Sequence, residues 1–275
     1  MRQNRYTMAA LDMDDTLLMP DKTIHPDTIR DINLASERGV EVVYCSGRAV
    51  AELRPYTQML PAMRYAVCMS GAVVYDFAKD RPLFVRAIRS EHVGKILETA
   101  ETYRGMLHFL TETESIVSEE ELPHLADFHR AEYQETFDKT ARGVPSMREE
   151  LKRHEAIPKV NIYFRSPSDR ERAMKDLLPL PVTSVYTGLT ALEMTAENVT
   201  KAAGLALLCG HLGIGMEEVM GVGDSLNDLD FLKAVGLPVA MGNSVPEILQ
   251  ICEAVTGDNL RNGAGAAIRR FCLSD

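Results

Sequence analysis

The sequence lacks the patterns of a secreted, membrane-spanning or zinc-binding protein. Its five cysteines are odd in number, contain no CxxC pair and lie mostly in apolar runs, so we expect reduced core thiols without disulfides. No apolar run approaches the length of a membrane span, and the N-terminal residues 1–5 lack the apolar segment of a signal peptide. The seven histidines show no HExxH spacing, which leaves a zinc site without support. These absences predict a soluble cytoplasmic protein with no membrane partner.

The sequence also has no excess of positively charged residues. The net charge of −10 argues against a nucleic acid or an anionic membrane as partner, although a metal ion and a few local cations would still allow a small anionic substrate. No GxGxxG follows the first apolar run, which disfavours a nucleotide-binding dehydrogenase. At 275 residues, with 45% hydrophobic and 25% charged residues, the chain is a globular protein of one large or two ordinary domains. The sequence does not distinguish a monomer from a dimer.

The first apolar run ends in a group of carboxylates. Residues 8–11 have the length and composition of a buried strand, and Asp12, Asp14 and Asp15 follow it directly. In an open parallel sheet, the crevice for chemistry lies beyond the carboxyl ends of the strands. Carboxylates this close repel one another, and a divalent cation with oxygen ligands would stabilise them. A polar turn, with Thr16 capping the next segment, is the alternative explanation.

Strands and helices alternate along the first sixty residues. Residues 26–35 form a predicted helix, with Pro26 at its first position and Gly39 just past its end. A strand over 40–45 and a helix over 49–59 follow. This alternation favours a parallel sheet with right-handed crossovers.

The middle of the chain has a different pattern, an α+β mixture without carboxylates at strand ends. We therefore predict an α/β fold in which residues 1–85 and 193–275 form a doubly wound, Rossmann-like core with a parallel sheet. Residues 86–192 form an inserted α+β domain in this prediction.

A second polar group follows the strand over 40–45. Ser46, Gly47 and Arg48 stand between that strand and the predicted helix. A hydroxyl, free backbone N–H groups and a glycine that lets a ligand approach the main chain make a natural anion site. Alternatively, Ser46 only caps the helix.

A third group opens a later helix. If Asn198 is the N-cap, Lys201 lies in the first helical turn, where the helix dipole disfavours a cation. This cost suggests that an anion lies nearby. A solvated lysine that tolerates a small loss of stability is the alternative.

A fourth group follows the apolar residues 219–223. Asp224, Asn227 and Asp228 cluster on one turn after a glycine. Helix capping explains one such residue, but it does not require all three. The four groups end strands or open helices, so a doubly wound sheet would bring them to one edge.

Taken in order, these motifs make the chain resemble the haloacid dehalogenase (HAD) superfamily. Residues 12–16 match the DxDxT loop, 46–48 the second motif, Lys201 the third and 223–228 the fourth, GDxxND. The insertion between the second and third motifs resembles the larger α/β cap of the Cof-type sugar-phosphate phosphatases. Two more segments are typical of that subfamily: 239–244 and 258–263.

The resemblance implies a phosphatase that requires Mg²⁺ and acts on a small phosphorylated substrate. It implies that Asp12 is the nucleophile and forms an aspartyl-phosphate, while Asp14 is the general acid and base. The metal ligands would be Asp12, the backbone carbonyl of Asp14, and Asp224.

The remaining motif residues would bind the phosphate or support the site. Ser46, Gly47, Lys201 and Asn227 are expected to hold the phosphate oxygens. Arg48 and Asp228 are expected to support the site, the latter by orienting Lys201 or a water molecule on the metal.

The chain departs from the family pattern at two positions. Asp15 stands where glycine is usual, and Ser70 stands where asparagine is usual. The inserted domain would act as a lid that selects the leaving alcohol. Its candidate specificity residues are His108, Arg130, Lys159 and Arg165, although the sequence favours a solvated surface position for each of them.

Two alternatives remain open. The same core could belong to a phosphomutase, a trehalose- or sucrose-phosphate phosphatase or another phosphoryl transferase. A non-catalytic module that binds metal or a phosphorylated ligand is disfavoured, because Asp12, Asp14, Lys201 and Asp224 are all present.

Overall fold

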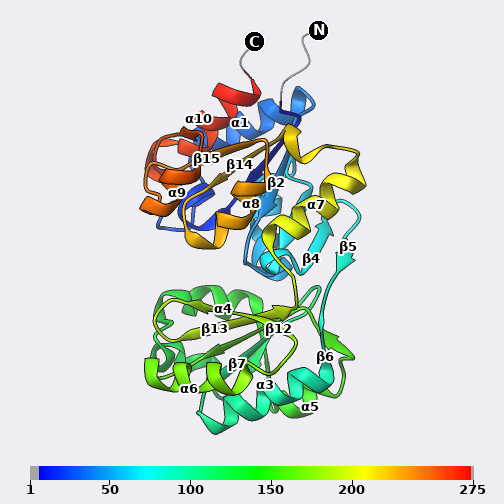
Figure 1. Cartoon of the computed structure of the whole chain (residues 1–275), viewed down its shortest axis with the longest axis vertical. Helices are drawn as coiled ribbons and strands as arrows, with labels where there is room; N and C mark the ends of the chain where they lie inside the picture. Colours follow the sequence, from blue (N-terminus) through cyan, green and yellow to red (C-terminus); the bar gives the residue numbers. More distant parts are fainter. Residues whose placement is uncertain (1–5, 274–275) are drawn as a thin grey trace. The chain divides into compact units, whose positions relative to one another are not determined.

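The computed structural model describes residues 6–273, which divide into two compact units. One unit extends to residue 47 and continues over 55–84 and from 200 onward; the other comprises 48–54 and 85–199 (Figure 1). Residues 1–5, from which we expected no signal peptide, lie outside the described part. Within that part, no helix is both long and apolar enough to cross a membrane.

The first unit is built on an eight-stranded sheet in the order β16-β15-β14-β1-β2-β3-β4-β5. Strands β16 to β3 run parallel, and β4 pairs antiparallel with β3. The strands are β1 (Met8–Leu11), β2 (Glu41–Cys45), β3 (Tyr65–Cys68), β4 (Val73–Asp76), β5 (Arg81–Val85), β14 (Val219–Gly223), β15 (Leu237–Ala240) and β16 (Ala254–Val255).

The strand order reverses between β1 and β14. From β1 the chain adds β2 and β3 on one side, whereas β14, which follows the insertion, pairs with the other side of β1. Both strands are buried along their whole length, as expected for central parallel strands covered on both faces. Such a reversal is where open α/β sheets bind ligands. The doubly wound α/β fold predicted from the sequence is confirmed.

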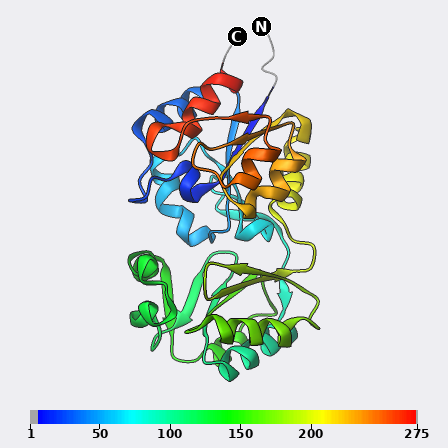
Figure 2. The ribbon, with the colours of Figure 1, turned by 60° about the vertical axis from the view of Figure 1, so that its left-hand side comes forward.

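Helices cover both faces of this sheet. Figure 2 shows α1 and α10 on one side and α7 and α8 on the other. Leu205 and Leu208 of α7 join the core beneath β1 and β3. The helices are α1 (Pro26–Glu37), α2 (Val50–Met59), α7 (Lys201–Leu212), α8 (Leu229–Ala234), α9 (Pro246–Ile251) and α10 (Gly263–Cys272).

The second unit contains a six-stranded sheet in the order β12-β13-β11-β7-β8-β9 and a two-stranded sheet, β10-β6. Its strands are β6 (Ile88–Arg89), β7 (Met106–Leu110), β8 (Ser115–Ser118), β9 (Ala141–Val144), β10 (Ala156–Ile157), β11 (Lys159–Tyr163), β12 (Val182–Thr187) and β13 (Ala191–Ala196). Its helices are α3 (Ser90–Thr102), α4 (Gln134–Thr140), α5 (Met147–Leu151) and α6 (Pro167–Leu177).

Side chains along the central strands of the second unit point alternately into an apolar core and to a polar face. Phe109 of β7 and Val160 and Ile162 of β11 pack into the apolar core with residues of α3 and α6. Their neighbours His108 and Asn161 point to the opposite face, because side chains alternate along a strand. That face is therefore polar even where it is buried.

The start of α7 lies very close to Gly71, just after β3. A Cβ atom on Gly71 would lie 1.9 Å from the carbonyl oxygen of Thr200, and Gly71 has a φ of +101°. Only glycine satisfies both conditions without strain. This close approach places the first turn of α7 against the end of β3.

We expect Gly71→Ala to lower the free energy of unfolding by at least about 3 kcal/mol, from the sum of φ strain and overlap with Thr200. Gly39→Ala is the matched control. Gly39 has a φ of +81° but nothing within 4 Å of the added methyl group, so we expect a loss of only about 1 kcal/mol. Urea unfolding of both variants measures the difference, and equal losses would contradict the steric argument.

Candidate active site

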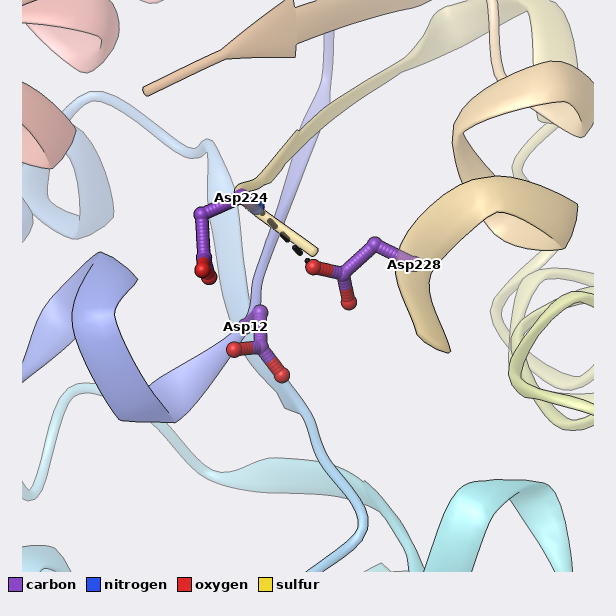
Figure 3. A group of neighbouring side chains, drawn as sticks. All are labelled: Asp12, Asp224 and Asp228. Atoms are coloured by element: carbon purple, nitrogen blue, oxygen red, sulfur yellow. Dashed lines mark hydrogen bonds between the residues drawn. The ribbon is translucent and has the colours of Figure 1, made fainter. Parts of the chain in front are cut away.

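Three buried carboxylates meet where the strand order reverses. Asp12 follows β1, Asp224 follows β14, and Asp228 lies just before α8 (Figure 3). Each offers an oxygen, and these oxygens all lie within 4.8 Å of one another. The backbone N–H of Asp12 donates to the carbonyl of Val222 at 3.0 Å, so the parallel pairing continues to the edge of the cluster. Neighbouring strands thus bring together residues that are more than two hundred positions apart.

Burial and mutual repulsion make this cluster unfavourable for negative charge. Burial, followed by repulsion from Asp228, raises the pKa of Asp12 well above its usual value, although Lys201 opposes the shift. The same two causes, in the same order, raise the pKa of Asp224 to about 7. A bound divalent cation would favour the ionised form of both groups.

Lys201 supplies positive charge from within the fold. Its Nζ donates to Oδ1 of Asp12 and to Oδ1 of Asp228, both at 2.6 Å. Although burial alone lowers the pKa of Lys201, attraction to these two carboxylates raises it, so the ammonium form is stabilised. The expectation that an anion lies close to this lysine is confirmed.

The cap of α7 differs from the prediction. Thr200, and not Asn198, is the N-cap, and its side chain accepts a hydrogen bond from the N–H of Ala203 at 3.1 Å. Asn198 has a φ of +60° and lies before the helix starts. Asp230 of α8 accepts from the N–H of Ala202 at 3.1 Å, so a carboxylate from another helix compensates for the absence of an acidic residue in this first turn.

Both oxygens of Asp228 are used within the protein. Oδ1 accepts from Lys201, and Oδ2 accepts from the backbone N–H groups of Asp224, at 3.0 Å, and Ser225, at 3.2 Å. The dashed line in Figure 3 marks the bond to Asp224. Asp228 therefore joins the lysine to the loop of Asp224, which leaves Asp12 and Asp224 as the better metal ligands of the three.

The side chain of Asp14 lies outside the carboxylate cluster. It forms an ion pair with Lys22, with 2.7 Å between Nζ and Oδ1, and is about one third exposed. The backbone of Asp14 is extended within the π-helical turn η1 (Met13–Leu17). An accessible carboxyl group two residues after Asp12 is suited to exchanging protons with a ligand and with water.

Ser46 is buried at the end of β2. Its N–H donates to Val67 at 2.8 Å, and its carbonyl accepts from Ser70 at 3.0 Å. Helix α2 begins only at Val50, so Ser46 does not occupy the position directly before the helix. Gly47 follows within the first unit.

Two other motif residues differ from the buried carboxylates in their surroundings. Arg48 groups with the second unit by its contacts. The side chain of Asn227 is exposed, and its Oδ1 accepts a hydrogen bond from Ser225. Asn227 is therefore not one of the buried side chains of the cluster.

The two departures from the family pattern both fall at left-handed backbone positions. Asp15 has a φ of +57° and Ser70 a φ of +58°. Glycine and asparagine, the usual residues at these positions, adopt a left-handed backbone at a lower cost than most residues do. Serine adopts it at a higher cost than asparagine. The resemblance to the family showed that Asp15 and Ser70 are unusual residues at their positions. It did not show the left-handed backbone that explains why glycine and asparagine are usual there.

Three polar residues around the cluster were not assigned to the site from the sequence, in which Thr16 was considered only as a cap. Thr16 Oγ1 donates to Asp224 Oδ1 at 2.9 Å. Asn243 donates to the carbonyl of Asp15 at 2.8 Å, and Asn259 donates to that of Leu18 at 2.9 Å. Both asparagines lie in the two additional segments that carried the family resemblance, and this position was the only available signal.

The four candidate specificity residues of the second unit differ in exposure. His108 and Lys159 are buried, so the surface interpretation is wrong for both. His108 contacts Ser115 at 2.7 Å, and burial lowers its pKa to about 3, so the ring is neutral. Lys159 pairs with Glu193 at 2.6 Å. Arg165 is exposed at the surface.

Arg130 is half-buried. It lies over the ring of Tyr163, with 5.0 Å between Cζ and the centroid, and donates to the carbonyl of Thr187 at 3.2 Å.

Comparison with known proteins agrees with this geometry. The chain is 28% identical to the HMP-PP phosphatase of Serratia proteamaculans over 88% of its length and 86% of that protein. It is also 28% identical to the 5-amino-6-(5-phospho-D-ribitylamino)uracil phosphatase YcsE of Bacillus subtilis, over 97% and 96%. A crystal structure of a haloacid dehalogenase-like hydrolase from Bacteroides thetaiotaomicron shares the fold, with a TM-score of 0.86 at 21% identity over 96% of this chain and 99% of the other.

Residues 9–268 match the family of haloacid dehalogenase-like hydrolases, a range that includes all four motifs. The family assignment predicted from those motifs is confirmed: this chain belongs to the haloacid dehalogenase-like hydrolase family.

Proposed function

We propose that the protein is a Mg²⁺-dependent phosphatase that hydrolyses a small phosphomonoester through an aspartyl-phosphate on Asp12. One observation supports this most strongly: Asp12, Asp224 and Asp228 are buried together, and the ammonium group of Lys201 donates to two of them, Asp12 and Asp228. In this buried site, ionisation of all three carboxyl groups is unfavourable without further positive charge. A site of this kind is suited to a divalent cation and a phosphate.

The residues present fit magnesium. Carboxylate oxygens of Asp12 and Asp224, with the backbone carbonyl of Asp14, form a hard oxygen donor set, and Asp228 is occupied by hydrogen bonds. When bound, the ion would screen the repulsion between Asp12 and the phosphate dianion and keep both carboxylates ionised. Thr16 donates to one oxygen of Asp224 and so orients this ligand.

Asp12 attacks phosphorus in the proposed reaction. Lys201 holds Oδ1 at 2.6 Å, which leaves the other oxygen for the attack. The bond from Asp12 to phosphorus forms as the bond from phosphorus to the alcohol oxygen breaks, and Asp14 donates the proton that the alcohol needs. A water molecule then attacks the aspartyl-phosphate and gives its proton to Asp14, which releases phosphate and restores Asp12.

The phosphate oxygens would be held by Lys201, by the Ser46 hydroxyl, by the backbone at Gly47 and by Asn227. Asp228 positions Lys201 through its 2.6 Å ion pair. Asn227 would donate from Nδ2 to the phosphate, since its Oδ1 accepts from Ser225. Arg48 is proposed to support this end of the site.

Residues 86–192 would act as the cap of a Cof-type phosphatase and select the leaving alcohol. Two relatives at 28% identity are phosphatases named for small phosphorylated metabolites, which supports a substrate of that size. Such a substrate is consistent with an enzyme of the cytoplasm.

The nucleophile is tested first. We expect Asp12→Asn to reduce the Mg²⁺-dependent hydrolysis of p-nitrophenyl phosphate at least about 1000-fold, because an amide does not attack phosphorus. EDTA should abolish wild-type activity, and added Mg²⁺ should restore it. Asp138→Asn, which removes an exposed carboxylate of α4, is the matched control and should keep wild-type activity. Wild-type activity in Asp12→Asn would contradict the mechanism.

A panel of phosphorylated metabolites then separates hydrolysis from transfer. Release of one inorganic phosphate for each substrate consumed indicates a phosphatase. Transfer of phosphate to a second hydroxyl without release would indicate a phosphomutase.

Asp224 gives a stability test that does not depend on turnover. Its carboxyl group ionises near pH 4 in the unfolded chain but at about 7 in the fold, so the folded state keeps the proton between these values. Without metal, the contribution of this group to stability is therefore lost as the pH rises from 4 to 7. We expect metal-free Asp224→Asn to melt several degrees above wild type at pH 8, with a smaller difference at pH 4.

Mg²⁺ should reverse this order at pH 8, because it stabilises only a protein that binds it. Thermal melting of both proteins with EDTA and with Mg²⁺ measures the effect. Equal stabilisation of both proteins by Mg²⁺ would exclude Asp224 as a ligand.

A further inference from the structure

Two asparagines connect the loop that carries Asp12 to two later loops of the same unit. Asn243, in the loop after β15, donates from Nδ2 to the carbonyl of Asp15 at 2.8 Å. Asn259, after β16, donates from Nδ2 to the carbonyl of Leu18 at 2.9 Å. The two residues are also joined, since the N–H of Asn259 donates to Oδ1 of Asn243 at 3.3 Å. Together they form one bridge, which we call the asparagine clamp.

The loop that carries Asn243 also holds the loop of Asp224. The N–H of Met241 donates to the carbonyl of Gly223 at 3.1 Å, and the N–H of Val245 donates to that of Asp224 at 3.0 Å. A single segment of five residues therefore contacts the loops of both proposed metal ligands. Displacement of this segment would change the separation of Asp12 and Asp224.

The loop after Asp12 has little regular structure to hold its shape. Its π-helical turn is closed by a 3.3 Å bond from the N–H of Leu17 to Asp12 and a 2.8 Å bond from that of Leu18 to Met13. Between them, Asp15 has a left-handed backbone, with φ +57° and ψ 7°, which costs free energy in a residue other than glycine. The clamp binds the carbonyl of this strained residue and the carbonyl at the end of the turn.

We propose that Asn243 and Asn259 are positioning residues, which fix Asp12 relative to Asp224 by holding the carbonyls of Asp15 and Leu18. This inference rests on the proposed function, because it assigns the clamp a role in that reaction. Neither asparagine touches the substrate in this proposal. Loss of the clamp should therefore reduce turnover and metal affinity more than substrate affinity.

The first experiment measures kinetics with p-nitrophenyl phosphate at several Mg²⁺ concentrations. We expect Asn243→Ala and Asn259→Ala to lower kcat about 10- to 100-fold and to raise the Mg²⁺ concentration for half-maximal activity, with KM changed less than threefold. Leu260→Ala is the matched control. Leu260 is an exposed neighbour of Asn259 outside the clamp, so this variant should behave like wild type. Unchanged kcat and Mg²⁺ dependence in both asparagine variants would overturn the proposal.

The second experiment detects the clamp without any activity. Hydrogen exchange of the peptide that contains Leu17 and Leu18 should be at least about tenfold faster in Asn259→Ala than in wild type, because the turn opens more often. Exchange at the wild-type rate would overturn the clamp even if the enzyme is a phosphatase. Faster exchange in a protein without phosphatase activity would instead support the clamp and reject the proposed function.

The third experiment uses the unusual residue at position 15. Glycine adopts a positive φ without strain, so a loop with Asp15→Gly depends less on Asn243. We expect Asn243→Ala to reduce kcat several-fold less in the Asp15→Gly background than in wild type. An equal or larger reduction in that background would contradict a role for the clamp in holding the strained backbone.

Discussion

The contact between Lys201 and the carboxylates of Asp12 and Asp228 is the interaction on which the rest of the site depends. Three carboxylates and one ammonium group are buried together, with 2.6 Å from Nζ to each of the two nearest oxygens. Removal of one partner from a buried ion pair leaves an uncompensated charge, so these groups are strongly coupled. One ammonium group does not balance three carboxylates, and this imbalance is the physical basis for expecting a divalent cation.

The topology explains how three distant parts of the chain reach this contact. Asp12 and Asp224 follow β1 and β14, which pair directly although the inserted unit separates them in sequence. Lys201 opens α7, whose position against β3 depends on the close approach of Thr200 to Gly71. The site therefore depends on backbone packing as much as on its own side chains. A methyl group at Gly71 would press on the backbone of Thr200 and Lys201 and so displace Lys201 without reaching its ammonium group.

The fold and the meeting of the carboxylates at one sheet edge could be predicted because each has a local signal. Alternating strands and helices indicated the parallel sheet, and carboxylates after apolar runs indicated Asp12 and Asp224. The cap at Thr200 was missed, because Asn198 and Thr200 are both good N-caps and only the backbone, with φ +60° at Asn198, distinguishes them. The surface explanation favoured for His108 was wrong, because one sequence does not reveal which face of β7 is covered.

Apart from the two family-typical segments in which its residues lie, the asparagine clamp had no signal in the sequence, since its partners are carbonyl groups that every residue possesses. Only the fold brings Asn259 to the carbonyl of Leu18. Two left-handed residues lie close to the proposed site. Asp15 is in the loop after Asp12, and Ser70 donates to the carbonyl of Ser46. A strained backbone persists where several surrounding contacts hold it in place, and the bond from Asn243 to the carbonyl of Asp15 is such a contact. In the proposed reaction, a rigid loop after Asp12 would lower the cost of orienting this carboxylate for attack, which gives a physical reason to maintain such strain.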